Sequence, residues 1–517
     1  MMRTPSRHTH AQAEPRPSGS VEPGSSGARR SLTVAAPPSF LSCGVSLILA
    51  MHLFASAAFA QSQPVINLKE LKYGAPGVVK VPEPVRFQLP NGMQVLLVED
   101  HELPTISMTA MIRAGGHWVA ADKLGLSGLT GTVMRTGGST TRNGDQLDRE
   151  LDRLGGSVEI TPGDDETTAS IFCLKEDLDK TLPILADLLQ HPAFPADKIE
   201  LAKIQMRDSI ARRNDDPQGI AFREYGRVLY GKDSPYGRLM EYATLNAITR
   251  DDLLAFHKQY YRPEGMILGA WGDFSANAMR AKIEQAFSAW KGDGPWRRPA
   301  APPVDAAKNR AGVYLVNKDD LNQSTVLLGR LAGRMDDPDF FPLTVMNGIL
   351  GDGFGSRLFS QVRSEQALAY SVWSSWTSSY EFPGMFYAFG GTKSETTVKI
   401  VGALRREIER LVQGPITDDE LARAKDSILK GVAFESDSTG KIVYRLMTYE
   451  YHGYPRDFLQ RYQDGIRKVT KADVERVAKL NMKSDQFAIL VLGKEKDFEA
   501  PLGSLGKVTR IDITIPK

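Results

Sequence analysis

The chain has 517 residues, of which 42% are hydrophobic and 24% are charged. This supply of apolar residues is enough for at least two buried cores and excludes an intrinsically disordered chain. The 64 basic and 62 acidic residues leave a formal net charge of only +2, so we expect neither a nucleic-acid partner nor association with a membrane surface.

Residues 1–60 have the composition of a secretory signal peptide. A segment rich in Ser, Pro, Arg and Gly precedes an apolar run over residues 40–60 that ends in Ala-Phe-Ala, which predicts cleavage near Ala60/Gln61 and a periplasmic or secreted mature protein. A retained membrane anchor is the alternative, and Arg29-Arg30 leaves twin-arginine export open beside the Sec route. Cleavage would leave Cys173 as the only cysteine, so no internal disulfide is expected.

Strands and helices can be predicted from the spacing of apolar residues. Alternation over residues 93–98 and 106–112 predicts half-buried strands. Over residues 196–214, apolar residues recur at helical spacing between Pro195 and Pro217, which predicts an amphipathic helix. We therefore expect an α+β fold.

Two parts of the chain share one pattern. Residues 97–115 match residues 315–333 at an offset of 218, and residues 248–273 match residues 469–494 at an offset of 221. Such a match indicates an internal duplication, and a Gly- and Pro-rich stretch between the copies indicates a linker. We expect a signal peptide (1–60), an N-terminal domain (61–290), a linker (291–310), a C-terminal domain (311–503) and a C-terminal tail (504–517).

Several segments, in their order along residues 83–500, resemble the pitrilysin/insulinase-type (inverzincin) peptidases. They are Leu89-Pro-Asn-Gly-Met, Arg113-Ala-Gly-Gly, Leu154-Gly-Gly-Ser, Ser234-Pro-Tyr-Gly-Arg, Tyr261-Arg-Pro-Glu-Gly-Met, Gly353-Phe-Gly-Ser-Arg-Leu-Phe and Ala367-Leu-Ala-Tyr-Ser-Val. The resemblance implies two homologous α/β-roll halves, as in mitochondrial processing peptidase, that form a clamshell around an unfolded peptide.

The zinc-binding signature of that family, His-x-x-Glu-His, is absent. The matching helix carries Gly128, Gly131 and Thr132, and the third ligand position falls on Ser209, with Asp208 beside it. None of the three helix residues can bind zinc or serve as a general base. His101 and His117 could meet Asp208 only if the fold brought them together, and we expect ordinary polar roles for them. We therefore expect no metal on this chain.

A second functional feature of the family is present. In its two-chain members, the subunit without zinc supplies an Arg and a Tyr seven residues apart to its partner's site, and Arg363 and Tyr370 match that pair. An Arg can hold a substrate carbonyl and a Tyr hydroxyl can donate to an oxyanion. The alternative is that Arg363 forms an ion pair with Glu365 or Glu150 and that Tyr370 begins a buried strand.

The resemblance also implies a substrate-binding surface. Gly156, Ser157 and Val158 match the edge strand along which the family binds peptides, although Glu159 and Pro162 depart from its pattern, and Gly353 and Gly355 belong to a Gly-rich loop expected to contact substrate. We therefore predict a non-catalytic subunit of a heterodimeric zinc metallopeptidase, inactive alone, with zinc on a homologous partner. The alternative is a stand-alone peptide-binding or assembly protein.

Overall fold

The computed structural model describes residues 82–305 and 310–517. The predicted signal peptide lies outside these ranges. Within them, no helix combines the length and the apolar composition needed to cross a bilayer.

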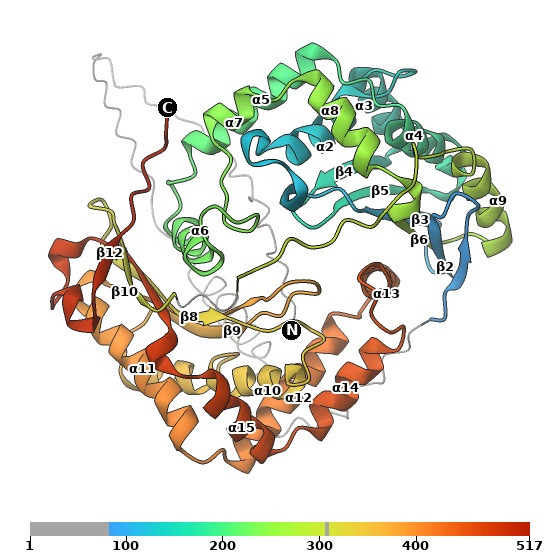
Figure 1. Ribbon diagram of the computed structural model, residues 1–517. Helices are drawn as coiled ribbons and strands as arrows, with labels where there is room; N and C mark the ends of the chain where they lie inside the picture. The colour runs from blue at the N-terminus through green and yellow to red at the C-terminus, as the bar shows by residue number, and fades with distance from the viewer. Residues whose placement is uncertain (1–81, 306–309) are drawn as a thin grey trace, which may run out of the picture. The chain divides into compact units, whose positions relative to one another are not determined.

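The first half contains a six-stranded mixed sheet (Figure 1). Only β2 and β6 are parallel neighbours, and the other pairs are antiparallel. Strand β4 lies at one edge. In spatial order the strands are β1 (Val85–Gln88), β2 (Gln94–Glu99), β6 (Met266–Gly272), β3 (Thr105–Ile112), β5 (Thr167–Leu174) and β4 (Ser157–Pro162).

The second half repeats the arrangement of β2, β6, β3, β5 and β4, with β9 at the edge that corresponds to β4. The opposite edges differ, because β1 pairs antiparallel with β2 whereas β12 pairs parallel with β7. In spatial order its strands are β12 (Val508–Arg510), β7 (Gly312–Asn317), β11 (Ala488–Gly493), β8 (Gln323–Leu331), β10 (Met385–Lys393) and β9 (Ser371–Trp376). Strands β2 and β7 begin 218 positions apart, as do β3 and β8. The predicted pair of homologous α+β halves is confirmed.

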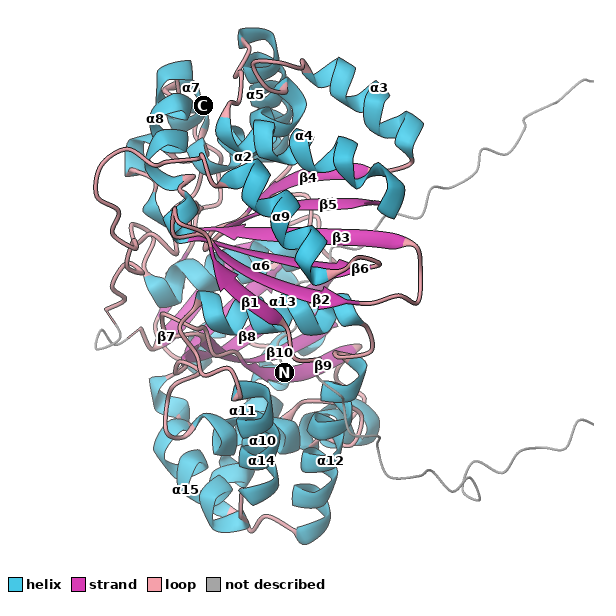
Figure 2. Cartoon of the chain, turned by 90° about the vertical axis from the view of Figure 1, so that its right-hand side faces the viewer, coloured by secondary structure: helices cyan, strands magenta, loops and turns pink. Residues whose placement is uncertain are grey.

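Helices pack against the sheet of each half (Figure 2). Those of the first half are α2 (Leu126–Gly137), α3 (Gly144–Leu154), α4 (Leu178–Gln190), α5 (Ala196–Ala211), α6 (Pro217–Tyr230), α7 (Tyr242–Asn246), α8 (Arg250–Tyr260) and α9 (Ala276–Phe287). Those of the second half are α10 (Phe340–Leu350), a π-helical segment (Phe359–Glu365), α11 (Thr397–Gln413), α12 (Asp418–Phe434), α13 (Thr439–Tyr451), α14 (Phe458–Lys468) and α15 (Lys471–Asn481).

One helix of each half packs on the sheet of the other half. Helix α13 covers β6, β2 and β3, where its Ile442, Val443, Leu446 and Met447 join a buried cluster with Leu96, Val98, Met111 and Ile267. The equivalent helix α6 covers β8 and β11, where Ile220, Ala221, Tyr225 and Leu229 join a cluster with Val316, Leu327 and Leu490. Figure 1 shows this exchange, with the green α6 beside the second sheet and the red-orange α13 beside the first. The two halves are therefore interlocked by apolar burial.

The C-terminal segment completes the second sheet and reaches the first half. Strand β12 pairs in parallel with β7, and the amide of Ile511 donates to the carbonyl of Leu315 at 2.8 Å. The side chain of Asn214, after α5, donates to the carbonyl of Ile513 at 2.7 Å. These contacts add a further connection between the halves.

Candidate functional site

The positions where the family would hold zinc are filled by other groups in this chain. A Cβ added at Gly131 would lie 3.0–3.1 Å from three ring atoms of Pro162 on β4, and one added at Gly128 would lie 3.4 Å from the terminal methyl of Met206 on α5. Thr132, one residue beyond Gly131, is partly buried. Pro162 and Met206 thus occupy the space that larger side chains on this face of α2 would need.

The third ligand position offers no metal donor aimed at α2. Ser209 and Asp208 are exposed on α5. The hydroxyl of Ser209 donates to the carbonyl of Gln205 at 3.1 Å, and Asp208 accepts from Arg212 at 3.1 Å. The face of α5 toward α2 is formed by Met206 and by buried apolar residues.

The histidines do not supply a substitute site. His101 bonds to Asp273 at 2.7 Å and His117 bonds to Asp165 at 3.0 Å, so neither meets Asp208. Across residues 82–305 and 310–517, no three His, Cys, Asp or Glu side chains are grouped so that they could hold a metal ion. Zinc bound by His and Glu ligands, as the family requires, does not fit the residues of α2 and α5.

Arg363 and Tyr370 are accessible. Arg363 is exposed on the π-helical segment Phe359–Glu365, where its guanidinium carbon lies 4.8 Å from the centroid of the Phe359 ring. Tyr370 is 53% exposed and directly precedes β9, with its backbone amide donating to the carbonyl of Gly391 at 2.9 Å. π-Helical turns are rare, and those that do occur are often found at functional sites.

The alternative partners of Arg363 are engaged elsewhere. Glu365 accepts a hydrogen bond from Gln361 at 2.6 Å, and Glu150 pairs with Arg142 at 3.4 Å. Within the described part of the chain, Arg363 forms no ion pair or hydrogen bond of its own. Its donors are therefore available to a ligand.

The predicted substrate-binding residues lie at edge strand β4 of the first half and in a loop of the second half. Gly156 directly precedes β4, whose outer side is unpaired by any other strand of the described chain. Ser157 is half-buried and the Val158 side chain is fully buried, so Val158 could meet a peptide only through its backbone. Gly353 and Gly355 are exposed in the loop between α10 and the π-helical segment.

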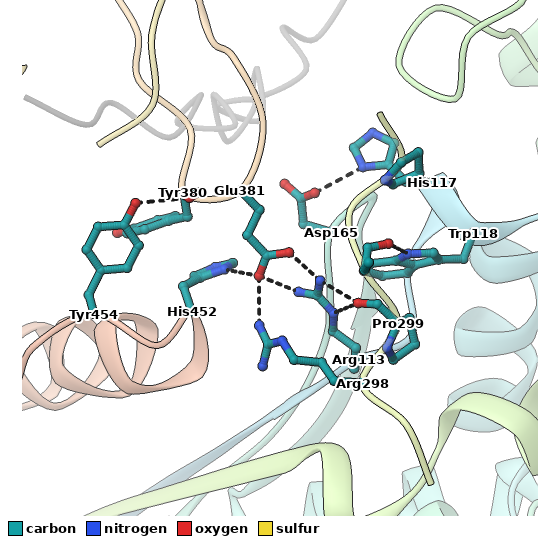
Figure 3. Close-up of polar contacts among 12 residues, drawn as sticks. Arg113, His117, Trp118, Asp165, Arg298, Pro299, Tyr380, Glu381, His452 and Tyr454 are labelled. Atoms are coloured by element: carbon teal, nitrogen blue, oxygen red, sulfur yellow. Dashed lines mark hydrogen bonds and ion pairs between the residues drawn. The ribbon is translucent and has the colours of Figure 1, made fainter. Parts of the chain in front are cut away.

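A polar cluster that the sequence did not predict joins the two halves (Figure 3). Its centre is Glu381, in the loop between β9 and β10. The carboxylate accepts from Arg113 at the end of β3 (2.9 Å), from Arg298 in the linker (2.7 Å) and from the Nδ1 of His452 at the end of α13 (2.9 Å). Arg113 also donates to the carbonyl of Pro299 at 2.9 Å.

Burial and neighbouring charges shift the pKa values of three groups in and beside this cluster. Although burial opposes ionisation, hydrogen bonds from His452 and Arg113 hold the pKa of Glu381 well below its usual range. Burial, with the neighbouring Asp165 carboxylate, raises the pKa of Glu166 to about 7. Burial lowers the pKa of His452 despite its bond to Glu381. Of these residues, the sequence pattern points only to Arg113, as part of the Arg-Ala-Gly-Gly segment. Its pairing with Glu381 could not be predicted, because the two residues lie 268 positions apart in the sequence.

Comparisons with known proteins agree with this architecture. Residues 94–234 match the family model described as insulinase (peptidase family M16), and residues 247–428 match the model described as the peptidase M16 inactive domain. A protein of Streptomyces coelicolor named an uncharacterized zinc protease is 25% identical over 80% of this chain and 90% of its own length. A zinc protease of Rickettsia felis, named in the same way, is 27% identical over 68% of this chain and 86% of its own length.

Solved structures show the same fold. A peptidase M16 inactive domain from Pseudomonas fluorescens is 24% identical, covers 79% of this chain and 97% of that chain, and has a TM-score of 0.69. A protease from Helicobacter pylori is 20% identical, covers 80% of this chain and 100% of that chain, and has a TM-score of 0.70. The predicted two-half α+β fold is confirmed. By sequence and by fold, the chain belongs to the insulinase-type peptidase family M16.

Proposed function

We propose that this chain is a non-catalytic subunit of a heterodimeric zinc metallopeptidase. It pairs with a homologous subunit that carries zinc, encloses unfolded peptides and contributes Arg363 and Tyr370 to the partner's site. Arg363 binds a carbonyl of the peptide, and the Tyr370 hydroxyl donates to the oxyanion that develops during hydrolysis. The zinc chemistry itself belongs to the partner.

One contrast between the halves carries this proposal. The zinc positions of α2 are filled by Pro162 and Met206, whereas Arg363 is exposed without an ion-pair or hydrogen-bond partner in the described residues and Tyr370 is 53% exposed. We further propose that residues 1–60 direct export and that the mature subunit acts in the periplasm.

The test is co-purification from the native host followed by an assay of peptide hydrolysis. We expect the chain to bring down a homologue with an intact His-x-x-Glu-His motif, and we expect the pair, but neither chain alone, to hydrolyse a quenched fluorescent peptide. Arg363→Ala should lower kcat/KM by about 100-fold and Tyr370→Phe should lower kcat by about 10²–10³-fold, the range found for oxyanion donors. Arg461→Ala, at an exposed ion pair on α14, is the control and should retain activity.

Three results would contradict the proposal. They are stoichiometric zinc tightly bound to the isolated chain, hydrolysis by the isolated chain, and full activity of both variants in the complex. If the chain binds unfolded peptides but recovers no zinc-bearing homologue, the stand-alone peptide-binding role is the better account.

A further inference from the structure

Two aromatic rings lie in a row with Arg363. The Phe354 side chain is 80% exposed, and its ring meets the half-buried Phe359 ring edge to face, with centroids 4.9 Å apart. The guanidinium of Arg363 lies over that same Phe359 ring at 4.8 Å. An exposed ring, a half-buried ring and a cation therefore form one continuous surface.

The backbone holds Phe354 in this exposed position. Gly353 has φ +96°, a conformation that residues with a side chain rarely adopt. The turn is closed by Ser356, whose hydroxyl and amide both donate to the carbonyl of Gly353, at 2.7 and 3.2 Å. The same hydroxyl accepts from the amide of Phe359 at 3.4 Å. The exposure of Phe354 is thus a product of the turn and not of a loose chain end.

The chemistry of the row specifies what could bind it. Arg363 needs carbonyl or carboxylate oxygens, and the Phe354 ring needs an apolar group within reach of the same ligand. In a folded protein most backbone carbonyls are already hydrogen-bonded within helices, sheets and turns. An extended peptide offers an unpaired carbonyl and a side chain within one residue of each other, so it satisfies both requirements.

We propose that Phe354 forms a subsite beside Arg363 that selects peptides with a bulky apolar or aromatic side chain next to the carbonyl held by Arg363. Phe354 contacts that side chain and sets specificity. Phe359 is a positioning residue that orients the Arg363 guanidinium through its ring face. This inference rests on the proposed function, because it assigns the substrate class of the same site.

Specificity is tested with two matched probes. They are a labelled Gly/Ser-rich peptide with a single Phe and the same peptide with Ala in its place. In the co-purified complex, kcat/KM should be higher for the Phe peptide, and Phe354→Ala should lower that preference by about tenfold, the scale of discrimination in apolar pockets. Phe354→Trp should preserve it. Phe434→Ala, which removes a ring 76% exposed at the end of α12, is the matched control and should leave the preference unchanged.

The positioning role of Phe359 has a different signature. Phe359→Leu keeps an apolar side chain but removes the ring face, so kcat/KM should fall by the same factor for both peptides. Phe359→Tyr keeps the ring and should restore activity. Thermal unfolding of each variant checks that the loss does not arise from misfolding.

The outcomes separate the two proposals. If Arg363→Ala impairs hydrolysis but Phe354→Ala leaves the ratio of the two peptides unchanged, the subsite is refuted and the proposed function stands. If a folded Phe354→Ala chain no longer recovers its partner, the ring belongs to the interface between subunits and the subsite is again refuted. Full activity of Arg363→Ala would refute the proposed function first. A parallel fluorescence-polarisation titration of the isolated chain should show weaker binding of the Phe peptide by Phe354→Ala.

Discussion

Glu166, which directly precedes β5, is a residue whose protonation should couple to folding. Burial raises its pKa from 4.5 to about 7, so folding takes up a proton between these values and stability falls as the pH rises across that interval. We expect Glu166→Gln to stabilise the protein relative to wild type at pH 8 more than at pH 5, by up to about 3 kcal/mol. Urea unfolding at the two pH values measures this difference.

Glu102→Gln, at an exposed position, is the control substitution and is measured at the same two pH values. A Glu166→Gln effect that does not change with pH would show that this carboxyl is solvated in the folded chain.

Two of the three glycines of α2, Gly128 and Gly131, should respond differently to alanine. In a helix interior Gly costs about 1 kcal/mol relative to Ala. At Gly128 a new Cβ would only touch the flexible end of Met206 at 3.4 Å, so Gly128→Ala should raise the free energy of unfolding by up to about 1 kcal/mol. At Gly131 it would press on the Pro162 ring at 3.0–3.1 Å, so Gly131→Ala should gain nothing or destabilise the protein. Equal gains at both positions would mean that Pro162 yields readily.

At the scale of elements, the exchanged helix α13 depends on close approach to β6. A Cβ at Gly269 would overlap the sulfur of Met447 and lie 3.0 Å from Val443. Gly269→Ala should therefore destabilise the protein by about 1–3 kcal/mol through overpacking. Met447→Ala alone should cost about 2–5 kcal/mol because it leaves a cavity.

The double variant tests whether these two losses share one cause. Met447→Ala removes the sulfur that a Cβ at Gly269 would overlap, and Gly269→Ala partly fills the cavity that Met447→Ala leaves. In a double-mutant cycle measured by urea unfolding, the double variant should therefore lose less unfolding free energy than the sum of the two single losses, by about 0.5–3 kcal/mol. Strict additivity would indicate that α13 shifts away from β6 when either residue changes.

The sequence predicted elements better than their packing. Helix α5 follows from apolar spacing, since Ile199, Ala202 and Ile210 are all buried. The positions of β2 and β3 are also predicted, but the prediction that these strands are half-buried is wrong. Both are buried on both faces, because α13 covers the face that alternation assigned to solvent. The exchange of α6 and α13 could not be predicted, because an amphipathic helix fits the face of either homologous sheet equally well. The absence of metal ligands on α2 could be read from its residue types, whereas its filling by Pro162 and Met206 depends on how β4 and α5 approach it.

Across the whole molecule, two kinds of contact join the two halves: apolar packing of exchanged helices and a cluster of ion pairs. Helix exchange buries apolar surface on both sheets, and the Glu381 cluster ties together β3, the linker, the β9–β10 loop and the end of α13. Separation of the two halves would therefore have to break both kinds of contact.

Glu381→Gln tests how much of this coupling is ionic. Arg113 is only 2% exposed, so loss of its carboxylate leaves a buried cation without a counter-charge, which costs about 3–5 kcal/mol. Arg298 is 41% exposed, and Arg298→Ala should cost less than about 1 kcal/mol because water screens that pair. Hydrogen exchange should quicken in the linker and at the end of α13 in Glu381→Gln alone. Similar small losses in the two variants would mean that helix exchange, without the ion cluster, holds the halves together.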